Sequence, residues 1–250
     1  MGMMIEAFHN GVCYLTFNRP EKKNAMSEEL VGEFYRSLKR AEREVATIVV
    51  IRGAEKTFSS GGDVNEFMDW TEPGIRSDAM INSFNKSILL IRTMPAIVIA
   101  VIEGLAVGGA VSLSLACDLT LAEENAVMNM GYRRIGLTPD AGGSIFLPHL
   151  VGMKLFNELY FLSRSINMAE AREIGIVNFV VSEGEIDARL AALIEELKAM
   201  PPGMTQKVKE LVNLSLFGGL SSHLDKERLF LSHCSSDPEF QERLRRLFKK

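Results

Sequence analysis

Cysteine, tryptophan and histidine are scarce in this chain of 250 residues, which contains three, one and four of them. Cys13, Cys117 and Cys234 are odd in number and far apart, with no CxxC pair and no histidine at ligand spacing. The sequence therefore predicts neither a disulfide framework nor a structural zinc site. We expect no metal, and a reducing, cytoplasmic location.

A strong charge of one sign and a long hydrophobic run are also missing. The 28 basic and 32 acidic residues give a net charge of −4, which does not indicate a nucleic-acid binder. The most apolar region, residues 88–117, is interrupted by Arg92, Pro95 and Glu103, so no uncharged piece of it reaches the roughly 18 residues of a membrane helix. The first residues lack the basic segment and apolar core of a signal peptide. We expect no nucleic-acid partner and no membrane association.

Strand and helix signals alternate through the first two thirds of the chain. Residues 11–17, 46–52 and 96–102 are short β-branched runs that predict strands. Between the first two, residues 27–44 have a capping serine and an apolar stripe at helical spacing. We expect an α/β body over residues 1–185.

Strand signals nearly vanish after about residue 152, and the remaining chain is predicted to be helical. A wide apolar face, formed by Ile186, Leu190, Leu193, Ile194 and Leu197, exceeds what a small α/β body needs. We therefore expect residues 186–250 to form a helical region that packs on the body or on a neighbouring subunit. The predicted helices are 152–163, 168–174, 186–199, 204–216, 221–233 and 238–249.

Two glycine-rich segments, Ser59–Asp63 and Gly104–Ala110, each follow a predicted strand and precede a helix start. Glycines there present backbone N–H groups without a Cβ in the way, at the positive end of a helix dipole. Neither segment matches a phosphate-binding or dinucleotide-binding motif. Each could be a turn or a tight packing site, or the two could supply the N–H pair of an oxyanion hole.

Five blocks of sequence occur in the order and at the separations typical of the crotonase, or enoyl-CoA hydratase/isomerase, family. They are LTFNRPEKKNAM (15–26), KTFSSGGDVNEF (56–67), GLAVGGAVSLSLACDLTLA (104–122), IGLTPDAGGSIFLPHLVG (135–152) and MAEAREIGIVNFVV (168–181). The chain resembles this family over nearly its whole length. The resemblance implies a crotonase-like spiral of ββα units, with a helical C-terminal region that builds a homotrimer or a dimer of trimers.

The resemblance also implies the parts of an acyl-CoA site. The two oxyanion-hole amides fall on Gly62 and Gly109, which would bind the thioester oxygen and stabilise an enolate. Coenzyme A would be part of the substrate, so no separate cofactor is implied. Further substrate-binding residues fall on Lys22 or Lys23 and on Phe58, Ser59, Ser60 and Gly61.

Two departures from the family's hydratases bear on the reaction. Hydratases hold a water between two glutamates, and the matching positions in this chain are Ser112 and Tyr132. Serine has no useful basicity near neutral pH and tyrosine titrates near 10, so neither easily replaces a carboxylate as general base. Both stay candidates for contact with the substrate, and ordinary water addition is disfavoured.

Asp140, in the segment PDAGG, is a carboxylate at a position where hydratases generally have glycine. Several isomerases of the family are similar in having an acid there. The alternative interpretation is that Asp140 only caps a helix that begins at Ala141. The leading hypothesis is an enoyl-CoA isomerase in which Asp140 shuttles one proton. The alternatives are a hydratase or thioester hydrolase of the same family, and a non-catalytic acyl-CoA-binding homologue.

Overall fold

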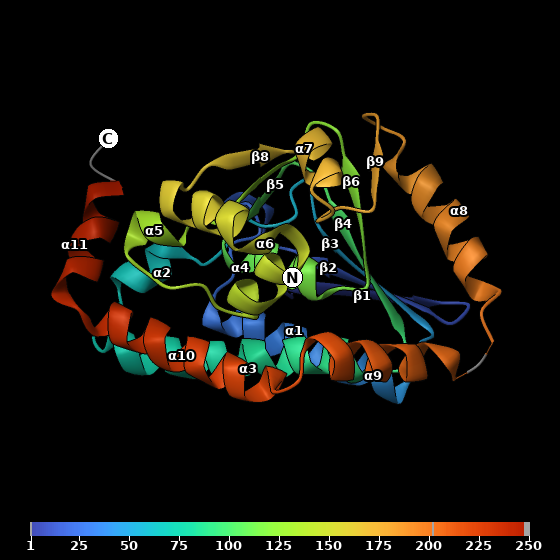
Figure 1. Cartoon of the computed structure of the whole chain (residues 1–250), viewed down its shortest axis with the longest axis horizontal. Helices are drawn as coiled ribbons and strands as arrows, with labels where there is room; N and C mark the ends of the chain where they lie inside the picture. The colour runs from blue at the N-terminus through green and yellow to red at the C-terminus, as the bar shows by residue number, and fades with distance from the viewer. Residues whose placement is uncertain (1, 202, 248–250) are drawn as a thin grey trace.

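The computed structural model describes residues 2–201 and 203–247. A six-stranded sheet forms its centre, in the spatial order β1-β2-β3-β4-β6-β9 (Figure 1). The first pair is antiparallel and every later pair is parallel. The strands are β1 (Met4–His9), β2 (Val12–Phe17), β3 (Ile48–Gly53), β4 (Ile97–Ile102), β6 (Leu119–Glu123) and β9 (Phe179–Val181).

A second, three-stranded sheet lies beside the first and carries the short strands that shape the site. Its order is β5 (Leu105–Val107), β7 (Val127–Asn129) and β8 (Ser165–Asn167). β5 follows β4 after a two-residue turn at Glu103 and Gly104, and β7 follows β6 after a three-residue turn at residues 124–126. The chain thus places one strand in each sheet in turn.

Helices cover both faces of the large sheet. One face holds the main core, which includes the long helices α1 (Glu28–Arg43) and α3 (Pro73–Thr93) and the short, fully buried α4 (Gly109–Ala116). α10 (Leu220–Ser236) runs along α3 (Figure 1). The other helices are η1 (Pro20–Lys22), α2 (Val64–Met68), α5 (Tyr132–Ile135), α6 (Gly143–Leu162), α7 (Met168–Glu173), α8 (Ile186–Lys198), α9 (Met204–Leu216) and α11 (Pro238–Leu247).

The central strands are apolar throughout because both of their faces are buried. In β4, Val98 and Ala100 point into the main core, while Ile97, Ile99 and Val101 point to the opposite face. There they meet α8, which stands against that face of the sheet (Figure 1). This arrangement explains why the sequence of β4 shows no alternation of apolar and polar residues.

The apolar face of α8 packs on the α/β body, which is one of the two partners expected for it. Ile186, Leu190, Leu193 and Ile194 are all buried within the chain, in the cluster on the outer face of the large sheet. The apolar surface of α8 is not more than the body needs, because both faces of the large sheet are apolar and each must be covered. The large apolar side chains that remain exposed lie elsewhere, mainly on α6 and α9.

The predicted α/β class is confirmed, and so are the strands at 11–17, 46–52 and 96–102 and the helix at 27–44, within two residues at each end. The C-terminal part is less purely helical than expected, because β8 and β9 lie within it. α6 begins at Gly143, and only its second half, after a kink at Gly152, matches the predicted helix at 152–163. The predicted end of the last helix at 249 falls outside the described residues.

The C-terminal helices share the main core with the α/β body. Leu224 and Leu231 of α10 and Phe240 and Leu244 of α11 are buried in it. A buried ion pair adds to this attachment, since Nζ of Lys209 on α9 lies 2.7 Å from Oδ2 of Asp118. Within the described ranges, no helix is long and apolar enough to cross a bilayer.

Candidate active site

The two glycine-rich segments lie side by side because the first pairs with β5. The N–H of Ser59 donates to the carbonyl of Leu105 over 2.9 Å, and the N–H of Val107 donates back to the carbonyl of Ser59 over 3.1 Å. Gly61, with φ of +85°, allows the close approach, since a Cβ there would stand 2.6 Å from the Val107 carbonyl oxygen. Gly62 and Gly109, which follow these paired stretches, are thereby brought to one cavity.

This cavity has a volume of about 220 Å³, and its wall includes Gly62, Gly109 and Asp140. No hydrogen bond runs from the N–H of Gly62 or Gly109 to another residue of the described chain. Gly109 is the first residue of α4, where an N–H has no partner within the helix and the helix dipole is positive. Both amides are therefore available to an oxygen atom of a ligand.

Asp140 lies next to the second of these amides. A Cβ built on Gly109 would stand 3.3 Å from Oδ1 of Asp140 and 3.0 Å from the ring of Phe84. Asp140 is 7% exposed, and burial raises the pKa of its carboxyl group from 3.8 to about 7. A hydrogen bond from Tyr132 opposes this rise, and the nearby Glu227 carboxylate adds to it. The side chain is thus poised between its two protonation states near neutral pH.

Ser112 and Tyr132, which the resemblance matches to the hydratase glutamates, belong to one hydrogen-bonded chain with Asp140. The Tyr132 hydroxyl donates to Oδ1 of Asp140 over 2.6 Å and lies 3.0 Å from Oγ of Ser112. Burial raises the pKa of Tyr132 well above its ordinary value, and the Asp140 charge adds to the effect. Tyr132 is therefore a hydrogen-bond donor to the carboxylate rather than a base.

Asp140 does not cap the helix that follows it. Helix α6 begins at Gly143 and not at Ala141, because Ala141 and Gly142 take positive φ angles of 52° and 86°. Their turn points the Asp140 side chain toward Tyr132, and only its backbone carbonyl meets the helix, through the N–H of Gly143 over 2.8 Å. The carboxylate that binds the N–H groups at this helix end comes from Glu227 of α10. No local sequence signal marks that role, since Glu227 is 85 residues from Gly142.

The residues expected to contact coenzyme A lie at varied distances from the cavity. Ser60 and Gly61 line it. Lys22 and Lys23 are exposed beside Ser60, whose N–H donates to the Lys23 carbonyl over 3.0 Å. Phe58 differs from the expectation, because its ring is fully buried in the core against Phe17 and is not available to a ligand.

Ser59 differs in the same way. Its side chain is fully buried, and its Oγ accepts the N–H of Gly61 over 3.1 Å. Its contribution is to hold the glycine loop in shape.

Most of the cavity wall is apolar and was not singled out by the sequence. Much of it comes from the helices α2, α3, α10 and α11, whose apolar residues resemble ordinary core positions. Among the described residues no group of three or more potential metal ligands occurs. The apolar wall residues are Met26, Val64, Phe67, Trp70, Met80, Ile81, Phe84, Val107, Ile135, Leu137, Leu231, Phe240 and Leu247.

Two free amides and one buried carboxylate around a small apolar cavity define a class of site. Convergent N–H groups bind a carbonyl oxygen that becomes negative, and a carboxylate with a pKa near neutrality exchanges a proton with a carbon beside it. Comparison with known proteins agrees with this class: residues 7–250 match the family model described as enoyl-CoA hydratase/isomerase. The chain belongs to the enoyl-CoA hydratase/isomerase family.

Individual relatives are similar at a moderate level. The chain is 30% identical over 238 residues to 4-chlorobenzoyl coenzyme A dehalogenase-2 of Arthrobacter sp, covering 94% of this chain and 86% of the relative. An enoyl-CoA hydratase from Mycobacterium avium subsp. paratuberculosis K-10 is 28% identical, with a TM-score of 0.90 over 99% of this chain and 96% of that one. A Thermobifida fusca YX structure in complex with acetoacetyl-CoA is 28% identical, with a TM-score of 0.79 over 90% and 92% of the two chains. The crotonase-like fold expected from the resemblance is confirmed.

Proposed function

We propose that this protein is an enoyl-CoA isomerase that moves a double bond along an acyl-CoA thioester, with Asp140 as the only proton shuttle. The observation that carries the proposal is the position of the buried Asp140 carboxyl group beside Gly109, with its pKa raised to about 7. A general base is most effective when its pKa lies near the working pH.

The reaction needs one proton taken and one returned. The thioester oxygen accepts the N–H groups of Gly62 and Gly109, and ionised Asp140 takes a proton from the carbon next to the thioester carbonyl. The electron pair of the broken C–H bond moves into the carbonyl, whose oxygen becomes the enolate oxygen held by the two amides. Protonated Asp140 then returns its proton to the far end of the conjugated system. The thioester carbonyl re-forms, and the double bond has moved into conjugation with it.

Ordinary hydration fits these residues less well. It needs a second base to hold and activate the water, and Ser112 and Tyr132 occupy the two positions from which hydratases supply glutamates. The raised pKa of Tyr132 leaves it protonated near neutral pH. One carboxylate is sufficient for an isomerisation, because the proton that it removes is the proton that it gives back.

The cavity is large enough for only one part of an acyl-CoA substrate. A volume of about 220 Å³ is below the roughly 300–1,000 Å³ of sites that enclose a whole drug-sized ligand. We expect the acyl group and thioester inside, with the coenzyme A part outside, where the exposed Lys22 and Lys23 can attract its phosphates. The acetoacetyl-CoA bound to the Thermobifida fusca relative supports an acyl-CoA ligand.

The dehalogenase relatives favour a second candidate, removal of chloride from an aromatic acyl-CoA. A carboxylate can also act as a nucleophile, and Phe67, Phe84 and Phe240 would suit an aromatic ring in the cavity. Asp140 would attack the carbon that bears chlorine, and the C–Cl bond would break with release of chloride. Water would then hydrolyse the resulting ester.

A panel of acyl-CoA thioesters tests these assignments. The purified protein is mixed with 3-enoyl-CoA, 2-enoyl-CoA and 4-chlorobenzoyl-CoA, and the conjugated thioester, free thiol and chloride are followed. We expect the 3-enoyl thioester to become conjugated, and the Asp140→Asn variant not to catalyse this. Hydration of the 2-enoyl thioester, thiol release or chloride release would each replace the isomerase assignment. Binding without any turnover would favour the non-catalytic homologue.

The assembly that we propose is a homotrimer or a dimer of trimers. Large apolar side chains are exposed on two helices of the C-terminal half, which is unfavourable for an isolated chain. They are Leu150, Met153, Phe161 and Leu162 on α6, and Met204, Val208, Leu211, Val212, Leu214 and Leu216 on α9.

A further inference from the structure

The N-terminal end of α6 is held by a carboxylate from a distant helix. Oε2 of Glu227 accepts the N–H of Gly142 over 2.8 Å, and Oε1 accepts the N–H of Ser144 over 2.9 Å. Oε1 also accepts the hydroxyl of Ser144 over 2.5 Å. Three donors from one turn therefore meet the two oxygens of one carboxylate, at the helix end where negative charge is favoured.

Glu227 stands directly behind the turn that carries Asp140. Asp140 precedes the Ala141–Gly142 pair with positive φ, and its own carbonyl accepts the N–H of Gly143. The turn is thus tied on one side to Glu227, through Gly142 and Ser144, and on the other to Tyr132, through the Asp140 side chain. Removal of Glu227 would free the backbone on which the direction of the Asp140 carboxyl group depends.

The two carboxyl groups are both buried. Glu227 is 5% exposed and Asp140 is 7% exposed. Carboxylates that share a buried site repel each other, so the ionised form of one disfavours ionisation of the other. In agreement, the Glu227 charge adds to the effect of burial in raising the pKa of Asp140.

We infer that Glu227 is a positioning residue of the active site, which orients the Asp140 turn and sets the pH at which Asp140 loses its proton. The inference rests on the proposed function of Asp140. Glu227 acts through Asp140 and the α6 backbone, and it does not line the 220 Å³ cavity. Its place on α10 makes the C-terminal helical region a part of the active site.

Other titratable or charged groups also face this turn. Tyr132 and Arg134 of α5 line the cavity with Asp140. On the far side of the turn, His223 and Lys226 of α10 line a second cavity of about 290 Å³ together with Ser144 and Glu227.

His223 is the member of this set that lies against Glu227. Its Nε2 lies 2.8 Å from Oγ of Ser144 and 3.7 Å from Oε1 of Glu227, and the nearby Glu227 carboxylate raises its pKa. A protonated His223 offsets the Glu227 charge, so the influence of Glu227 on Asp140 is greatest when His223 is neutral.

Two variants separate the charge of Glu227 from its hydrogen bonds. Glu227→Gln removes the charge and keeps the size, whereas Glu227→Asp keeps the charge on a shorter side chain. The midpoint of the rise of kcat/KM with pH is measured for each. We expect Glu227→Gln to lower this midpoint by about one unit, and Glu227→Asp to leave it close to that of the parent.

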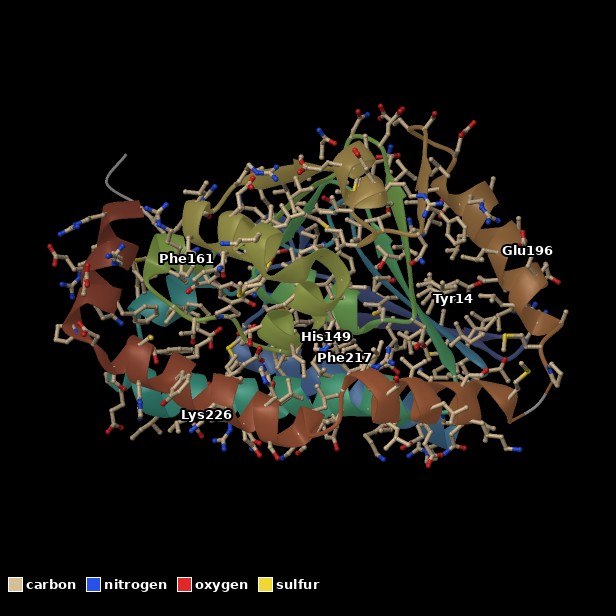
Figure 2. All side chains as sticks on the ribbon, in the orientation of Figure 1. Tyr14, His149, Phe161, Glu196, Phe217 and Lys226 are labelled. Atoms are coloured by element: carbon tan, nitrogen blue, oxygen red, sulfur yellow. The ribbon has the colours of Figure 1, made fainter. Side chains whose placement is uncertain are left out.

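Two further variants are matched controls. Ser144→Ala removes one hydrogen bond of Glu227 without altering its charge, and should move the midpoint little. Glu196→Gln removes the same charge from α8, at the other end of the molecule from Lys226 of α10 (Figure 2). An unchanged midpoint in Glu227→Gln, with only a lower melting temperature, would reduce Glu227 to a helix cap and overturn the inference.

A readout that needs no substrate tests Glu227 separately from the proposed reaction. The carboxyl stretching band of protonated Asp140, identified by its loss in Asp140→Asn, is titrated by infrared difference spectroscopy. We expect the pH at the midpoint of this titration to be lower in Glu227→Gln and unchanged in Glu196→Gln. If the protein isomerises no enoyl-CoA and this shift is still seen, the proposed function fails and the tuning by Glu227 stands. If the band does not shift, the inference fails whatever the activity.

Discussion

The hydroxyl group of Tyr132 donates a 2.6 Å hydrogen bond to Oδ1 of Asp140. This bond stabilises the ionised carboxylate, whereas burial and the Glu227 charge favour the protonated form. The balance leaves the pKa of Asp140 at about 7. Tyr132 thus holds the Asp140 carboxyl group and limits the rise of its pKa.

Loss of the Asp140 carboxylate should abolish turnover without unfolding the protein. Asp140→Asn keeps the size of the side chain and an oxygen that can accept the Tyr132 hydroxyl. Because the proposed base is removed, we expect kcat for isomerisation of a 3-enoyl-CoA to fall by about 10²–10⁴-fold. Absorbance of the conjugated product gives kcat, and calorimetric titration gives the affinity for the thioester, which should change little. Near-parental turnover would contradict the assignment of Asp140 as the base.

Asp140 should also make the stability of the protein depend on pH. Its pKa is 3.8 in an ordinary setting and about 7 in the fold, so the folded chain binds this proton more tightly than the unfolded chain. The contribution to stability is therefore complete below about pH 4 and is lost progressively as the pH rises to about 7. Melting temperatures of the parent and of Asp140→Asn, measured from pH 5 to pH 8, should diverge, with the variant relatively more stable at the higher pH. A constant difference across this range would count against a raised pKa.

Tyr132→Phe should shift the activity toward alkaline pH, in the direction opposite to Glu227→Gln. The hydrogen bond from the Tyr132 hydroxyl lowers the pKa of Asp140. We therefore expect its removal to raise that pKa by about one unit. Activity at pH 7 should fall, while activity well above the midpoint should remain close to that of the parent. The kcat/KM profile against pH measures this, with Ser112→Ala as a control that leaves the Asp140 bond in place. Loss of activity at every pH would instead identify Tyr132 as a catalytic residue.

The variant Gly109→Ala, which adds one methyl group, should impair the oxyanion site more than the stability of the fold. The added Cβ would meet the ring of Phe84 at 3.0 Å and Oδ1 of Asp140 at 3.3 Å, so α4 or the carboxyl group must shift by a few tenths of an ångström. We expect kcat to fall by about 10²-fold, the scale of losing one oxyanion donor. Gly32→Ala, in α1 with its nearest contact a flexible arginine at 3.4 Å, is the matched control and should leave kcat unchanged. Equal losses in both variants would assign the effect to general destabilisation.

The proposed trimer should depend on the exposed apolar surface of α9. Leu211 is 66% exposed, so Leu211→Glu should leave the folded chain intact and weaken an interface formed there. Sedimentation velocity at micromolar concentration should show a trimer or hexamer for the parent and smaller species for the variant. Ile75→Glu, on α3 and 63% exposed, should not change the assembly. A monomeric parent protein would refute the proposal.

Local sequence determined a large part of this structure. The strands at 11–17 and 96–102 were predictable because β-branched runs between turns have few other stable conformations. The glycine segments were also found from the sequence, because glycines between a predicted strand and a helix start form a recognisable pattern. Asp140 was singled out through the resemblance to the enoyl-CoA hydratase/isomerase family. By contrast, β5, β7 and β8 have three residues each, which is too short for a periodic signal.

Tertiary structure alone decided how these parts work together. Glu227 looks like an ordinary helix residue in the sequence, and Tyr132 was singled out only as a departure from the hydratase pattern. Folding places both near Asp140, where burial and charge decide its pKa. The apolar face of α8 could cover a sheet or a neighbouring subunit, and in the fold it covers the apolar outer face of the large sheet. The cavity wall depends on α10 and α11, whose leucines and phenylalanines have core spacing. Sequence specifies such local preferences, whereas contacts between distant segments depend on which buried surfaces remain to be covered and which buried polar groups remain to be paired.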